Sequence, residues 1–104
     1  MPNIKIFTPP PRLDSGNAPA FEKEVAGEIE AGAHHVLFDF SQLSYISSAG
    51  LRVILMAAKK TKAAGGKLAL CCLSEPVNEV FMVSGFNNIL DIQPTRDAGL
   101  ARLQ

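Results

Sequence analysis

The sequence predicts an α/β fold, with about four to five strands in a mostly parallel mixed sheet and about four helices. Short apolar runs alternate along the chain with longer segments whose apolar residues recur at three- and four-residue spacing. Strands that alternate with helices form βαβ units, which pair in parallel through right-handed crossovers. The length of 104 residues, with 47% hydrophobic and 19% charged residues, is typical of one globular domain. We therefore treat residues 1–104 as a single domain.

The first half of the chain is expected to hold two strands and one helix. Ile4–Phe7 can form a short strand, which the prolines at 9–11 end because proline cannot donate to a ladder. Residues 18–31 place apolar side chains on one face and acids and lysine on the other, which predicts an amphipathic helix. Residues 36–40 are apolar except for Asp39, as in a strand buried on both faces.

The second half is expected to continue the alternation. Lysines gather at the end of the first of its helices, where the helix dipole favours positive charge. Thr95 is placed to cap the last helix. The expected helices cover residues 51–63, 75–83 and 95–103, and the expected strands cover residues 67–73 and 89–92.

Composition and charge exclude several partner classes. Ten basic and ten acidic residues cancel, and no basic patch marks a nucleic-acid interface. No apolar run approaches the roughly 20 residues that span a bilayer, so membrane insertion is not expected. The first five residues lack the charged and apolar regions of a signal peptide, so we expect a cytoplasmic protein.

The two cysteines, Cys71 and Cys72, are adjacent within an apolar strand. Neighbouring side chains of a strand point to opposite faces, so a disulfide between them is not expected. We interpret them as small buried hydrophobic residues. Further ligands at metal-binding spacing are not visible, and we predict neither a metal nor a cofactor.

Ser47 and Ser48 stand between a predicted strand and a predicted helix, at the edge of the sheet where ligands usually bind. Either serine could cap the helix. Alternatively, an exposed serine there could carry a phosphate, which a helix N-terminus accommodates. Ala49 and Gly50 leave the approach open, and Arg52, one turn after Ser48, is either a phosphate ligand or a solvated residue.

A serine nucleophile is not expected. The Gly-x-Ser-x-Gly elbow needs glycine at position 46, where Ile46 stands. His34 and His35 precede their strand and so should lie at the opposite end of the sheet from the serines. We therefore predict no catalytic residues and no enzyme activity.

The stretch Asp39-Phe40-Ser41, followed after four residues by Ile46-Ser47-Ser48-Ala49-Gly50-Leu51, resembles the signature of the STAS domain family, the anti-sigma factor antagonists. Other parts of the chain are similar to that family in the same order, at residues 12–21, 62–68, 74–77 and 81–86. The resemblance implies a single STAS-like domain.

The resemblance also implies a mechanism of partner switching in bacterial transcription regulation. The unphosphorylated domain would bind an anti-sigma factor that is also a serine kinase, phosphorylation would release it, and a PP2C-type phosphatase would restore it. Ser48 matches the phosphoacceptor, with Ser47 as the alternative, because many antagonists carry an acid where Ser47 stands. Asp14 would lie beside it, or act as a turn or capping residue. The implied partner surface comprises Asp14, Ser47, Ser48, Ala49, Gly50 and Arg52.

The region before the Leu13-Asp14 segment is short for this family, which usually has two strands there, whereas these residues leave room for one, followed by three prolines. The edge of the sheet could therefore be covered by a partner or a second copy, and we expect a monomer or a weak homodimer. Small STAS proteins also serve as constitutive subunits of signalling complexes or lipid-transport ATPases, which is the alternative function.

Overall fold

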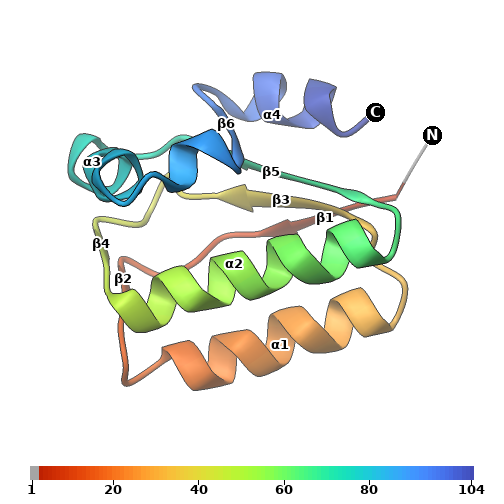
Figure 1. Ribbon diagram of the computed structural model, residues 1–104, viewed down its shortest axis with the longest axis horizontal. Helices are drawn as coiled ribbons and strands as arrows, with labels where there is room; N and C mark the ends of the chain where they lie inside the picture. Colours follow the sequence, from red (N-terminus) through yellow and green to blue (C-terminus); the bar gives the residue numbers. More distant parts are fainter. Residues whose placement is uncertain (1–2) are drawn as a thin grey trace.

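The computed structural model describes residues 3–104, and its centre is a four-stranded sheet in the order β1-β3-β5-β6 (Figure 1). The strands are β1 (Ile4–Phe7), β3 (His35–Asp39), β5 (Lys67–Cys71) and β6 (Asp91–Gln93). Every strand pairing within the described residues is parallel, so the antiparallel component of a mixed sheet is not present there. The predicted α/β class is confirmed. Met1 and Pro2, the start of the segment that lacks signal-peptide features, lie outside the described residues.

Helices cover both faces of the sheet (Figure 1). The long helices α1 (Ala18–Glu30) and α2 (Ser48–Ala63) lie side by side on one face, and α4 (Arg96–Arg102) covers the other. The helix α3 (Glu75–Val83) and the 3₁₀ turn η1 (Phe86–Asn88) lie near the carboxyl ends of the strands. Within residues 3–104, none of these helices combines the length and apolar character needed to span a bilayer.

The strands β3 and β5 are buried on both faces, as predicted. Val36, Phe38 and Leu70 pack into the larger core beneath α1 and α2. The alternate residues Leu37 and Ala69 face α4 and pack against Leu103. The period of two along each strand therefore builds two separate cores from one sheet.

A second, two-stranded sheet was not predicted. It pairs β2 (Arg12–Leu13) with β4 (Tyr45–Ile46) in parallel. One strand, β1, precedes the segment that begins at Arg12, as expected, and β2 lies within that segment. Strands of two residues are too short to show alternation, and β2 follows directly after three prolines. The Ser47 N–H donates to the Leu13 carbonyl at 2.9 Å and extends this ladder to the start of α2.

Two expected strands end or begin elsewhere. The strand expected over residues 67–73 ends at Cys71, because Cys72 adopts a left-handed conformation with φ 63°. The strand expected over residues 89–92 begins at Asp91, because the 3₁₀ turn precedes it and leaves Ile89 70% exposed. At both places, the apolar residues continue beyond the strand, so the apolar pattern predicted the wrong strand boundary.

Candidate functional site

The two serines at the start of α2 have different roles. Ser47 is the N-cap: its backbone is extended, and its hydroxyl oxygen accepts the Gly50 N–H at 3.3 Å. Ser48 is the first helical residue and is exposed, and its hydroxyl forms no hydrogen bond within residues 3–104. The capping requirement is therefore met by Ser47, and the Ser48 hydroxyl remains free to react or to bind.

Gly50 is buried and forms a close contact between α2 and β2. A Cβ atom at Gly50 would lie 2.9 Å from the Leu13 carbonyl oxygen and 2.8 Å from the Cγ1 atom of Ile46. Only a residue without a side chain lets the backbone of β2 approach the first turn of α2 so closely. Gly50, one of the residues predicted to belong to a partner surface, is buried and packs against β2.

Asp14 follows β2 and lies beside the start of α2. Because Leu13 pairs with Ile46, Asp14 is the next residue in register with Ser47. One carboxylate oxygen of Asp14 accepts the Gly16 N–H at 2.9 Å, and the other lies 3.7 Å from the Nε atom of Arg12. Asp14 is thus a turn residue, one of its two expected roles, and its side chain remains 36% exposed on the same edge as the serines.

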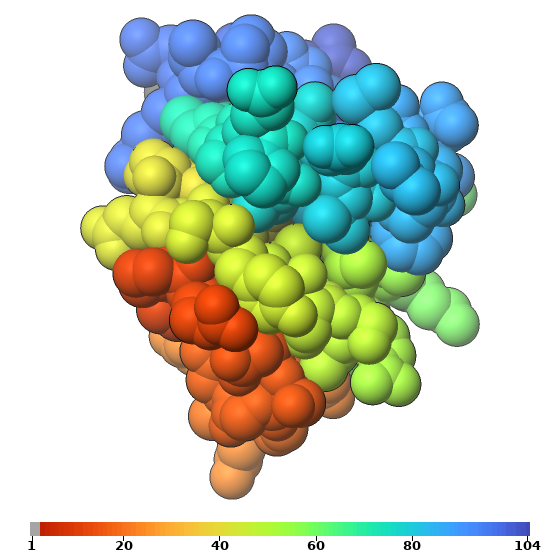
Figure 2. Space-filling view, turned by 90° about the vertical axis from the view of Figure 1, so that its left-hand side faces the viewer, coloured from red at the N-terminus to blue at the C-terminus, as the bar shows by residue number. Residues whose placement is uncertain are grey.

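A groove runs between the first turns of α1 and α2. Figure 2 looks onto this side of the molecule, where the connection from β2 into α1 (red to orange) lies against the start of α2 (yellow-green). Arg52 is exposed at the groove and forms no ion pair within the described part of the chain. The groove brings together two segments that are about thirty residues apart in the sequence. Its lining residues are Ser15, Ala18, Pro19, Glu22, Ala49 and Arg52.

A cation–aromatic pair on the same side was not predicted from the sequence. The Arg12 guanidinium lies 4.3 Å from the centre of the Tyr45 ring, and Tyr45 is 44% exposed. These residues face each other because β2 pairs with β4, with Arg12 directly opposite Tyr45. No sequence signal was available for this contact, since neither strand was predicted. His35, by contrast, begins β3 and so lies at the opposite end of the sheet, as predicted.

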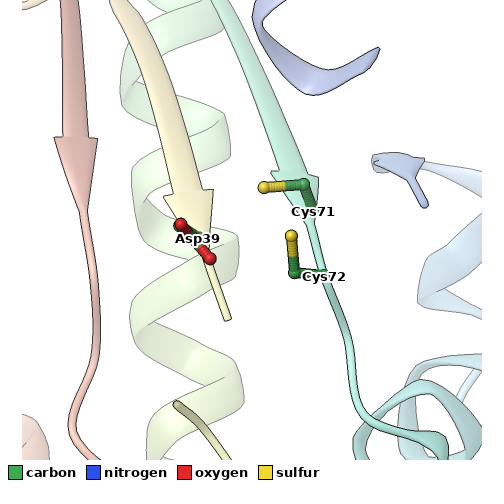
Figure 3. Close-up of side chains that lie close together, drawn as sticks. All are labelled: Asp39, Cys71 and Cys72. Carbon is green, nitrogen blue, oxygen red and sulfur yellow. The ribbon is translucent and has the colours of Figure 1, made fainter. Parts of the chain in front are cut away.

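A separate cluster occupies the carboxyl ends of β3 and β5, on the α4 face (Figure 3). The sulfur atoms of Cys71 and Cys72 and a carboxylate oxygen of Asp39 all lie within 4.8 Å of one another. Asp39 accepts the Ser41 N–H at 2.9 Å and the Arg96 Nη1–H at 3.1 Å. The prediction that the two cysteines face opposite sides was wrong, because the left-handed backbone at Cys72 returns its side chain to the side of Cys71.

The environment shifts the pKa values of this cluster. Burial by itself raises the pKa of Asp39, but the hydrogen bonds from Ser41 and the charge of Arg96 outweigh it and hold the pKa below its usual range. Burial, together with the neighbouring Cys72 thiol and the Asp39 charge, raises the pKa of Cys71 to about 12. Asp39 is therefore an anion paired with Arg96, and Cys71 is a neutral thiol in the free protein.

The parallel sheet, the capped α2 and the exposed serine at its first position define a known class of domain. The sequence model of the STAS domain family matches residues 1–99, and the chain belongs to this family. Among its relatives is BtrV of Bordetella bronchiseptica, a protein assigned by name to the anti-sigma factor antagonists. The two are 43% identical over 89 residues, which cover 86% of this chain and 77% of BtrV.

Two further similar proteins are also named as anti-sigma factor antagonists. The anti-sigma-B factor antagonist of Bacillus subtilis is 31% identical over 88 residues, covering 85% of this chain and 80% of that protein. The crystal structure of tm1081 from Thermotoga maritima, assigned to the same group, superposes with a TM-score of 0.92 at 27% identity. That match covers 96% of this chain and 86% of tm1081.

Proposed function

We propose that this protein is an anti-sigma factor antagonist whose partner binding is switched by phosphorylation of Ser48. The observation that carries the proposal is the exposed, uncommitted hydroxyl of Ser48 beside a serine that already caps the helix. The relatives named as anti-sigma factor antagonists support an anti-sigma factor as the partner. In this proposal that anti-sigma factor is also a serine kinase. A PP2C-type phosphatase would reverse the modification, and the pathway would operate in the cytoplasm.

The physical basis is the position of Ser48 at the first turn of a helix of 16 residues. A phosphate there meets the positive end of the helix dipole and free backbone N–H groups, so the folded state tolerates it. Arg52, exposed and one turn further along, is available to pair with the phosphate. The modification would add about two negative charges at the start of α2, and the partner would meet a changed surface on an unchanged fold.

In this proposal the protein is a binding module and not an enzyme. The partner would contact Ala49 and Arg52 in the groove between α1 and α2, and Asp14 after β2, with Ser47 and Gly50 supporting the surface from below. The exposed Arg12–Tyr45 pair would extend this surface. Tyrosine and arginine side chains that become buried in an interface are often the residues that contribute most to its affinity.

The test is a matched set of charge substitutions, with binding to the anti-sigma factor kinase of the same organism measured by calorimetry. Ser48→Asp should lose binding, and Ser48→Ala should bind but accept no phosphate from ATP. Ser47→Asp is the control, because aspartate retains the capping role while adding a charge one residue away. It should bind like the wild type.

Equal binding by Ser48→Asp and the wild type would overturn the switch. Intact-mass spectrometry of the protein from its native host, with site mapping, provides the independent check. A phosphate on Ser48 supports the proposal. Protein that stays unmodified under growth and stress conditions, bound in a stable assembly, would instead make it a constitutive subunit.

A further inference from the structure

We infer that Cys71, Cys72 and Asp39 form a binding site for a thiophilic divalent cation of the zinc class. Figure 3 shows the three side chains converging at the carboxyl ends of β3 and β5, where their ligand atoms lie within 4.8 Å of one another. Two sulfur atoms and a carboxylate oxygen are ligands that zinc accepts, in a site that leaves one position for water. This inference does not depend on the proposed partner switch.

The fold brings the three groups together by two separate devices. Asp39 and Cys71 are direct neighbours in the parallel register of β3 and β5, so their side chains emerge on the same face of the sheet. Regular alternation would send the next side chain, that of Cys72, to the other face. The left-handed conformation of Cys72, with φ 63°, brings its sulfur atom back to the first two groups. A residue other than glycine adopts this conformation at a cost of about 1 kcal/mol or more, and such positions cluster at functional sites.

The surroundings of Asp39 are those of a supported metal ligand. Its side chain is 6% exposed, and its two carboxylate oxygens accept hydrogen bonds from the Ser41 N–H and the Arg96 guanidinium. Ligating carboxylates are held by such partners, which orient them toward the ion. Access is from the side of Cys72, which is only partly buried, and of Arg96, whose side chain is 52% exposed.

The net charge of the cluster is the same with and without a bound divalent cation. In the free protein the Asp39 carboxylate pairs with the Arg96 guanidinium, which offsets its charge. A divalent cation that displaces both thiol protons leaves the net charge of the cluster unchanged, because two positive charges arrive and two protons leave.

Oxidation is the competing chemistry for two thiols this close, and the chain geometry disfavours it. Adjacent Cα atoms are about 3.8 Å apart across a trans peptide. That separation is below the range of about 4.4–6.8 Å in which disulfides usually form. Hard cations such as Mg²⁺ and Ca²⁺ are also disfavoured, because they require a larger set of oxygen ligands.

The experiment is an anaerobic titration of the reduced full-length protein with Co²⁺, followed by displacement with Zn²⁺. We expect one Co²⁺ per chain, thiolate-to-cobalt charge-transfer absorption, and an affinity that rises with pH because protons are released. Since Cys71 and Cys72 are the only cysteines of the chain, the absorption reports on this site alone. Cys72→Ser, at the partly buried position, should weaken Co²⁺ binding by at least about tenfold while the circular dichroism spectrum is retained.

The role of Asp39 as a ligand is tested by a matched pair of variants. Asp39→Asn should weaken binding, whereas Asp91→Asn should leave it unchanged, because Asp91 lies on the neighbouring strand β6 and pairs with Arg102. Three results would overturn the inference: no charge-transfer absorption, equal affinity of the wild type and Asp39→Asn, or one ion shared by two chains.

Discussion

The substitution Gly50→Ala tests the contact that joins the small sheet to the first turn of α2. The added Cβ would lie 2.8 Å from Ile46 Cγ1 and 3.0 Å from Leu13 Cγ, and 2.9 Å from the Leu13 carbonyl oxygen. The Leu13 side chain is fully buried and cannot swing into solvent. The carbonyl is held by the Ser47 N–H at 2.9 Å, so backbone atoms must move to relieve the overlap.

The expected magnitude follows from two opposing effects. Overpacking a well-packed site costs about 1–3 kcal/mol. Replacing glycine with alanine inside a helix contributes up to about 1 kcal/mol in the other direction. We therefore expect Gly50→Ala to lower the free energy of unfolding, by up to about 2 kcal/mol. The sign is the informative result, because helix propensity alone predicts the opposite.

The assay is urea unfolding monitored by circular dichroism, with Gly27→Ala as the control. Gly27 lies in α1 and is exposed, and a Cβ atom added to it would meet no atom of the described residues within 4 Å beyond its chain neighbours and the backbone of its own helix. The same substitution at Gly27 should raise the free energy of unfolding by about 0.5–1 kcal/mol. If both variants were stabilised to the same degree, the argument for close packing at Gly50 would be wrong.

Further predictions concern the two serines and the buried acid. Ser47→Ala should lower the free energy of unfolding by about 1 kcal/mol because the helix cap is lost. Ser48→Ala should stay within about 0.5 kcal/mol of the wild type. Equal losses of the two variants in urea unfolding would contradict the assignment of the cap to Ser47. The pKa of Asp39 lies below its unfolded value of about 3.9, so its contribution to stability is complete well above that pH and is lost as the pH falls through the folded pKa. The stability difference between the wild type and Asp39→Asn should therefore be largest near neutral pH and shrink in acid, and a difference independent of pH would refute this.

Much of the fold follows from local patterns in the sequence. The alternation of apolar runs with amphipathic segments is enough to define four strands of a parallel sheet and its helices, because each period is set by the geometry of a single element. The lysines at the end of α2 and the capping threonine of α4 were interpreted correctly for the same reason. The resemblance to the STAS family also depended only on the order and spacing of short motifs.

The tertiary structure decided the features that depend on contacts between distant segments. Ser47 rather than Ser48 caps α2, and Gly50 is buried rather than exposed, because β2 packs against residues more than thirty positions later in the chain. The approach of Cys72 to Asp39 and Cys71 required a left-handed backbone in a residue that normally avoids it. Two-residue strands and a single unusual φ angle have no periodicity, so their positions are set by packing and appear only in the folded chain.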